Sequence, residues 1–230
     1  MPPASGGQPP AGMGALGGGS GGAAPLPTAV NPPVIPSGGA PGDVLLFDDF
    51  EDGDASGWIV DSSDGAERVD GWAVVTTDEG RAYAQRDDSS DDDTWSIGGS
   101  VYWSDVDVAT RFRFTAADEI EDAVAMFAVR FRSREAYYYI EYRGDGSLKL
   151  RKRFDGSDTD LVSEDLERVA VLGEWIDIAV SARGGSLQVT LDGVAVGAAV
   201  NDGDVPAGGI GLGVSESAAV EFDDVRVTVP

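Results

Sequence analysis

Apolar residues alternate with charged or tyrosine residues through the middle of the chain, and this two-residue period most constrains the fold. It runs through residues 111–114, 130–132, 137–143 and 148–153. Because successive side chains of a strand point to opposite faces, each run has one apolar face and one face of arginine, lysine or tyrosine. The pattern therefore predicts half-buried strands in this part of the chain.

We expect the apolar face of these strands to form a core and the other face to form a wet sheet surface. The predicted core residues are Phe112, Phe114, Phe131, Tyr138, Ile140, Tyr142, Leu148 and Leu150. The predicted surface residues are Arg111, Arg113, Arg130, Arg132, Tyr137, Tyr139, Glu141, Arg143, Lys149, Arg151 and Arg153. Guanidinium groups bind carboxylates and sulfates in a bidentate manner, and tyrosine rings stack on sugars, so this surface suits an oxygen-rich polymer.

Short β-branched and aromatic runs separated by Gly, Asp and Ser turns continue this pattern to the end of the chain. The expected strands span residues 44–50, 73–76, 82–86, 100–103, 107–115, 124–133, 137–143, 147–154, 175–182, 186–191, 194–200, 209–214 and 219–229. Residues 163–171 fit either a helical turn or an irregular strand. Many short strands without convincing helices indicate a β-sandwich or barrel.

The first 42 residues differ from the rest of the chain. They contain no charged or aromatic residue, but they hold 12 of the 32 glycines and 10 of the 12 prolines. Such a segment buries too little apolar surface to offset its ordering entropy, so we expect a disordered tether at residues 1–42 and a β domain at residues 43–230. All 41 acidic and 16 basic residues fall in the second part, and the net charge of −25 argues against nucleic-acid binding.

The absence of cysteine and histidine excludes several chemistries. Zinc sites built from these residues, Ser-His-Asp catalysis and Cys-His catalysis are all ruled out. No apolar stretch reaches 18 residues, so we predict no transmembrane helix. The uncharged tether ahead of an acidic β domain looks like the start of a mature bacterial lipoprotein. We therefore expect an extracellular or cell-surface protein, with a possible lipid anchor upstream of the tether.

Both ends of the expected domain carry recognisable patterns. The first comprises residues 46–53 (LFDDFEDG), 57–58 (GW) and 70–74 (DGWAV), and the last comprises residues 208–213 (GGIGLG) and 220–227 (VEFDDVRV). This order resembles the concanavalin A-like lectin/glucanase superfamily, which includes laminarinase-like and laminin-G-like modules. The resemblance implies a jelly roll of two antiparallel sheets, with the first and last strands paired and ligand bound on the concave sheet.

The resemblance also implies a structural calcium ion. The matching positions are Asp49, Glu51, the Gly71 carbonyl, Asp224 and its neighbour Asp223. Carboxylates brought together by strand pairing repel one another unless a cation intervenes, and calcium prefers six to eight oxygen ligands. The alternative is that these aspartates accept backbone N–H bonds at turns and strand ends.

The sequence argues against catalysis, although it leaves the question open. Glucanases of the superfamily carry a Glu-x-Asp-x-Glu type motif on a strand, whereas the nearest string here, residues 118–122, falls between strands and lacks the middle Asp. Lyases of this fold use a histidine, which is missing. Tyr139 could still act as a base if Arg130 or Arg132 neutralised a uronate carboxylate, because an arginine-rich wall would lower the pKa of the tyrosine.

We therefore expect a non-catalytic module that binds polysaccharide, preferably acidic, on a concave sheet. The predicted ligand-binding residues are Arg111, Arg113, Arg130, Arg132, Tyr137, Tyr139, Arg151 and Arg153. A polysaccharide lyase or glycoside hydrolase of the same fold is one alternative. A structural or protein–protein interaction module, in which the arginines simply pair with acidic loops, is the other.

Overall fold

The computed structural model describes residues 39–62, 71–87, 93–216 and 218–230, and these residues form strands, turns and loops without an α-helix. The expected tether therefore lies almost wholly outside the described residues. In the described part of the chain, no helix is long and apolar enough to cross a membrane.

The strands are β1 (Val44–Asp48), β2 (Ile59–Ser62), β3 (Trp72–Thr76), β4 (Arg81–Gln85), β5 (Thr94–Gly98), β6 (Val106–Ala117), β7 (Val124–Ser133), β8 (Ala136–Arg143), β9 (Ser147–Phe154), β10 (Ser157–Asp165), β11 (Ile176–Arg183), β12 (Ser186–Leu191), β13 (Val194–Asn201), β14 (Gly209–Ser215) and β15 (Ala218–Thr228).

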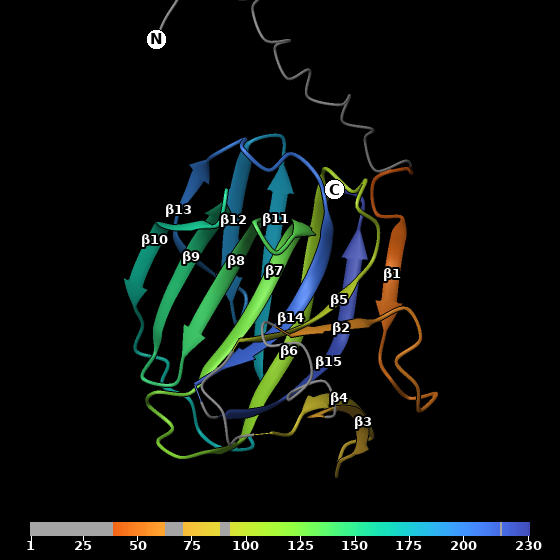
Figure 1. Cartoon of the computed structure of the whole chain (residues 1–230), viewed down its shortest axis with the longest axis vertical. Helices are drawn as coiled ribbons and strands as arrows, with labels where there is room; N and C mark the ends of the chain where they lie inside the picture. Colours follow the sequence, from red (N-terminus) through yellow and green to blue (C-terminus); the bar gives the residue numbers. More distant parts are fainter. Residues whose placement is uncertain (1–38, 63–70, 88–92, 217) are drawn as a thin grey trace, which may run out of the picture. The chain divides into compact units, whose positions relative to one another are not determined.

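The strands form two antiparallel sheets that lie face to face (Figure 1). Sheet A has the order β13-β12-β11-β6-β15-β4-β3, and β1 also pairs with β15. Sheet B has the order β10-β9-β8-β7-β14-β5-β2. This arrangement confirms the predicted all-β jelly-roll sandwich.

The last two strands of the chain lie in the middle of the two sheets. In sheet B, β14 pairs with β7 on one side and β5 on the other. In sheet A, β15 pairs with β6 along one edge and with β4 and β1 along the other. The predicted pairing of the first and last strands is therefore confirmed.

The core between the sheets consists of the side chains that alternate inward from both. Phe112, Phe222, Ile140 and Tyr142 are each at most 2% exposed and belong to one continuous cluster. Burial of side chains of this size contributes about 1.5–3 kcal/mol each. Of the eight predicted core residues, only Phe131 lies outside this cluster.

A bulge in β7 explains why Phe131 faces the other way. The register of β7 against β8 shifts between Val129 and Ser133, and Arg130 adopts a left-handed backbone conformation with φ of 53°. An extra residue in one strand reverses the faces of the residues beyond it. Phe131 therefore joins the outer face of sheet B, and Arg130 turns inward. Gly208 makes this possible, because a Cβ atom there would overlap the backbone of Arg130.

Three strands were not expected from the sequence, namely β2, β5 and β10. The strand predicted at residues 100–103 is wrong, because this segment forms a turn after β5. The ambiguous segment at residues 163–171 contains the end of β10 and a loop.

Candidate functional site

The predicted arginine and tyrosine residues do not share one surface. Arg111 and Arg113 lie on β6 in sheet A, whereas the tyrosines of β8 and the arginines of β9 lie in sheet B. The expectation of a single face is therefore wrong. Apart from Arg130 and Phe131 in β7, side chains alternate within these strands as expected, but alternation alone does not say which strands belong to the same sheet.

Arg130 is not on a surface at all. Its side chain is fully buried, and it donates hydrogen bonds from Nε to the Ser104 carbonyl at 2.9 Å and from Nη1 to the Val205 carbonyl at 3.3 Å. The Asp105 carboxylate lies 3.6 Å from Nη2. Burial lowers the pKa of Arg130, as expected for a charge removed from water. Arg130 therefore holds two loops to β7, while its neighbour Arg132 is exposed at the end of the strand.

Four aromatic rings pack on the outer face of sheet B. Phe131 stacks on Tyr137 with ring centroids 4.7 Å apart, and Trp95 meets Tyr137 edge to face at 5.5 Å. Tyr139 is 5.3 Å from Tyr137, and all four residues are at most 5% exposed. These rings form a second apolar cluster, separate from the core between the sheets. Such a cluster gives the face a rigid base.

A polar depression of about 280 Å³ lies beside this aromatic cluster. Its lining residues are Asp93, Val124, Met126, Tyr139, Glu141, Arg143, Arg151, Asp158, Ser215 and Glu216. They come from β7, β8, β9, β10 and the end of β14, from the residue after β14, and from the segment before β5. Four carboxylates and two guanidinium groups therefore surround one hollow, which we call the sheet B depression.

The arginines around the sheet B depression are held by carboxylates. Arg151 donates to Glu141 at 2.8 Å and to Asp160 at 2.7 Å, and its guanidinium group lies 5.5 Å from the Tyr139 ring. Arg143 donates to Asp122 at 3.1 Å, and Arg153, which is not among the lining residues, donates to Asp158 at 3.2 Å. These pairs fix the side chains in place and leave none of the three guanidinium groups free of a carboxylate.

The tyrosines of this face are poor bases. Burial raises the pKa of Tyr137 to about 12, although the nearby Arg153 opposes the shift. Burial and the Asp158 carboxylate likewise raise the pKa of Tyr139. The expectation that an arginine wall would lower the pKa of Tyr139 is therefore wrong, because desolvation of the phenolate outweighs the attraction of the arginines.

Arg111 and Arg113 belong to a separate cluster on the outer face of sheet A. Their guanidinium groups lie 4.5 and 4.4 Å from the ring of Trp175. Arg113 donates to Glu221 at 2.7 Å, and the Trp175 indole donates to Glu79 at 2.8 Å. The sequence did not indicate Trp175 as a partner of these arginines, because Trp175 directly precedes β11 and alternation does not say that β11 pairs with β6.

The residues predicted to hold calcium are engaged in contacts within the protein. Glu51 accepts the Arg81 amide at 2.8 Å, and Arg111 lies 2.5 Å from Asp223 and 3.2 Å from Asp224. Asp49 accepts a weak bond from the Glu51 amide at 3.3 Å. In the part of the chain that the structure describes, no three acidic side chains are grouped to hold a metal ion.

At the pair Asp223 and Asp224, the Arg111 guanidinium thus supplies the positive charge that calcium was expected to supply. The fifth predicted ligand, the Gly71 carbonyl, accepts the Arg86 amide at 3.0 Å. Calcium at this point of the fold stays a prediction that no described contact supports.

Solved structures with the same fold include several carbohydrate-binding proteins. The carbohydrate-binding module CBM66 of Bacillus subtilis aligns with a TM-score of 0.55 at 18% identity, over 75% of this chain and 95% of that one. Domain 4 of AbnA, an extracellular arabinanase of Geobacillus stearothermophilus solved with arabinotriose, aligns with a TM-score of 0.54 at 14% identity, over 83% and 94%. A galectin-like protein of unknown function from Bacillus subtilis aligns with a TM-score of 0.59 at 10% identity, over 82% and 97%.

These likenesses confirm the concanavalin A-like fold that the resemblance implied. No curated protein matches the sequence. The sequence pattern of one domain family, the 3-keto-alpha-glucoside-1,2-lyase-like domain, matches residues 42–228, which is nearly the whole of the chain after the uncharged segment. The chain therefore belongs to the family of 3-keto-alpha-glucoside-1,2-lyase-like domains.

Proposed function

We propose that this domain binds carbohydrate, without catalysis, in the sheet B depression. The observation that carries the proposal is the depression itself, in which carboxylates, arginines and a tyrosine converge on one hollow of about 280 Å³. A ligand site typically has a few fixed polar groups on a rigid base. Here the ion pairs fix the polar groups, and the aromatic cluster supplies the base.

The chemistry of the lining suits sugar hydroxyl groups. Each hydroxyl can donate one hydrogen bond and accept others, so a wall of alternating acceptors and donors can satisfy a ring of them. Glu141 and Asp158 are acceptors, and Arg143 and Arg151 are donors. Charge-assisted bonds of this kind are about twice as strong as neutral ones.

Because the arginines are already paired with carboxylates, we propose a neutral rather than an acidic carbohydrate as the ligand. The preference for acidic polysaccharide assumed guanidinium groups available to bind carboxylates or sulfates, whereas Arg151 and Arg153 already bind Glu141, Asp160 and Asp158. The lining also holds four acidic side chains against two arginines. An anionic polymer would meet net repulsion there, while a neutral polymer would not.

Binding is favoured over lyase or hydrolase chemistry. A tyrosine base needs a phenolate, and the raised pKa of Tyr139 leaves it protonated at neutral pH. Glu141 and Arg151 form an ion pair at 2.8 Å, a contact that holds the Glu141 side chain in place as a hydrogen-bond acceptor. The family description and the arabinotriose in domain 4 of AbnA both support a carbohydrate ligand.

We also propose that the protein acts outside the cell or on its surface. This proposal is supported by the fold that the chain shares with a domain of an extracellular arabinanase. A lipid anchor upstream of the first 42 residues stays a prediction, since these residues lie almost wholly outside the described part of the chain.

The test is calorimetric titration of the full chain with arabinan, a neutral polymer, and with polygalacturonate, an acidic one. We expect arabinan to bind at least tenfold more tightly. The variant Glu141→Gln keeps the shape of the side chain but removes its charge and its ion pair with Arg151, which stays bound to Asp160, so it should weaken binding at least tenfold. Arg134→Ala removes an arginine that pairs with Asp61 away from the depression and serves as the matched control.

Three results would contradict the proposal. Equal binding by the Glu141→Gln and Arg134→Ala variants would remove the sheet B depression as the site. Release of shorter sugars from either polymer would make the protein an enzyme. Failure to bind both polymers, together with self-association in sizing chromatography, would favour a structural module.

A further inference from the structure

On the outer face of sheet A, the small side chains of Ala109, Ala179 and Thr190 form the middle of a row that crosses the strands. The registers pair Arg226 with Ala109, Ala109 with Ala179, and Ala179 with Thr190. The row continues to Phe47 on β1 at one end and to Ala195 on β13 at the other. Neighbouring strands are about 4.8 Å apart, so the part from Arg226 to Thr190 spans roughly 14 Å.

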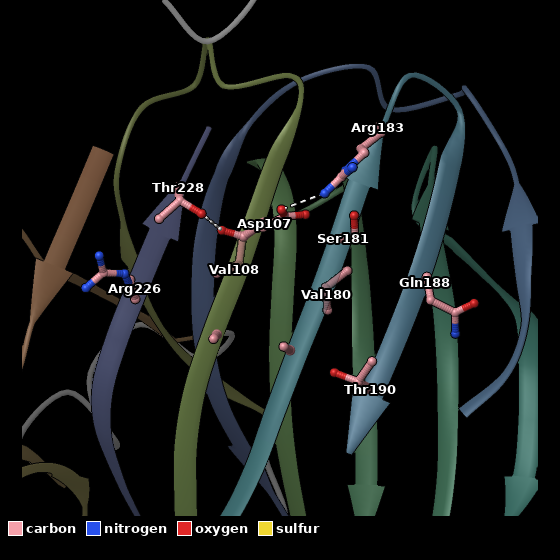
Figure 2. A pocket seen from close by; sticks show the side chains of 11 residues that line it. Asp107, Val108, Val180, Ser181, Arg183, Gln188, Thr190, Arg226 and Thr228 are labelled. Carbon is pink, nitrogen blue, oxygen red and sulfur yellow. Dashed lines mark hydrogen bonds and ion pairs between the residues drawn. The ribbon is translucent and has the colours of Figure 1, made fainter. Parts of the chain in front are cut away.

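Polar side chains border the row on both sides. The next row toward the β11–β12 turn contains Thr228, Asp107, Ser181 and Gln188, with Arg183 beyond it, and Figure 2 shows these side chains around the hollow. The next row on the opposite side contains Arg111 and Asp177. Two adjoining depressions of about 360 and 350 Å³ result, and both include Ala109, Ala179 and Thr190. We call them together the sheet A trough.

The sheet A trough is electrically balanced in an acidic domain. Its charged lining residues are Asp107, Asp177, Asp224, Arg111, Arg183 and Arg226. These are three acids and three bases, whereas the chain has 41 acids and 16 bases. Arg183 donates to Asp107 at 2.7 Å, and the Arg226 guanidinium lies 5.7 Å from the Phe47 ring. The trough thus attracts neither anions nor cations strongly, and its surroundings repel anions.

We propose that the sheet A trough is a second carbohydrate-binding surface, which takes a linear, neutral oligosaccharide laid across the strands. A sugar ring has apolar C–H faces and hydroxyl groups around its edge. The floor of alanines suits the C–H face, and the bordering hydroxyl, amide, carboxylate and guanidinium groups suit the hydroxyls.

An extended peptide fits this trough less well. Its backbone N–H and C=O groups would lie against the alanine floor, which offers no hydrogen-bond partner, and buried unpaired polar groups are costly. The trough also runs across the strands rather than along a sheet edge, where an added strand could pair its backbone.

The two sites would lie on opposite sheets of one domain. The sheet B depression uses residues of β7, β8 and β9, and the sheet A trough uses residues of β6, β11, β12 and β15. The domain would therefore hold two neutral sugar chains at once. The trough does not depend on the function proposed for sheet B.

The test is a nuclear magnetic resonance titration of the full, ¹⁵N-labelled chain with arabinohexaose, cellohexaose and mannohexaose in turn. With at least one of them, we expect the amide signals of Ala109, Ala179 and Thr190 to shift. The variant Ala179→Leu fills the floor and should weaken this binding at least tenfold. Ala199→Leu adds the same side chain at an exposed position of β13 outside the trough, so its binding should match that of the unmodified chain.

The outcomes separate the two sites. Loss of the trough shifts in Ala179→Leu but not in Ala199→Leu supports the trough, whether or not the signals of the sheet B depression also shift. Shifts confined to the sheet B depression would overturn the trough, and so would absence of shifts with all three sugars. Trough shifts with a neutral Gly-Ala-Ser peptide, but with none of the sugars, would replace it by a peptide site.

Discussion

Replacing Arg130 with alanine should destabilise the domain without altering any exposed surface. The side chain donates two buried hydrogen bonds, to the carbonyls of Ser104 and Val205. A hydrogen bond from a charged group contributes about 1.5–3 kcal/mol, and the 3.3 Å bond should lie at the lower end, which suggests about 3–5 kcal/mol for the pair. Relief of the buried charge offsets part of this loss, so we expect a net destabilisation of about 3 kcal/mol.

This change should be visible in two assays. A loss of about 3 kcal/mol corresponds to a melting temperature lower by about 6–12 °C for a domain of this size. Urea unfolding followed by tryptophan fluorescence gives the free energy directly, because Trp95 and Trp72 are buried. The neighbour Arg132 is exposed, so Arg132→Ala should change stability by less than about 0.5 kcal/mol.

A glycine variant separates the backbone from the side chain. Because φ of Arg130 is 53°, Arg130→Gly removes the same hydrogen bonds but relieves the strain of a left-handed residue. It should be at least as stable as Arg130→Ala. A destabilisation below about 1 kcal/mol in Arg130→Ala, or an equal effect of Arg132→Ala, would refute the reasoning.

Three further predictions concern charges elsewhere in the domain. Burial opposes ionisation of Asp202, but hydrogen bonds from Lys152 and Tyr138 outweigh burial and lower the pKa of Asp202. The ionised Asp202 therefore stabilises the fold above its unfolded pKa, and this stabilisation is lost as the pH falls below about 3.8. The difference in melting temperature between the unmodified chain and Asp202→Asn should shrink over that acid range, and a constant difference would contradict this. Trp175→Ala should cost about 1–2 kcal/mol in urea unfolding because two arginines stack on the ring, and an unchanged midpoint would contradict it. Since Arg111 neutralises Asp223, millimolar calcium and then a chelator should leave the melting temperature unchanged, whereas a rise of several degrees with calcium would restore the metal site.

The two-residue period predicted the central strands and most of the core, because half-buried strands require that alternation. The period did not predict three of the strands, for physical reasons. β10 contains only two apolar residues, Leu161 and Val162, and pairs through acidic residues with the basic side chains of β9. β2 and β5 are four and five residues long, too short for a period to show.

The candidate site was predicted less well than the fold. Sequence alternation placed Tyr137, Tyr139, Arg151 and Arg153 on an outer face, where the structure has them. It failed at Arg130, because a bulge depends on the loop that packs over it and leaves no period of its own. The ion pairs of β9 with β10 could not be predicted either, because the sequence did not indicate that residues 157–160 form a strand beside Arg151 and Arg153.

The central position of β14 and β15 has a consequence for how the protein is made. A chain ending before residue 209 would split sheet B between β7 and β5 and sheet A between β6 and β4, so neither sheet would be continuous. Residues 209–228 must therefore be synthesised before the sandwich can close, and this demand for contacts between distant residues implies slow folding. Until then the apolar faces of the thirteen strands before β14 stay open, so the pairing of β14 and β15 is the step that ends their exposure to aggregation.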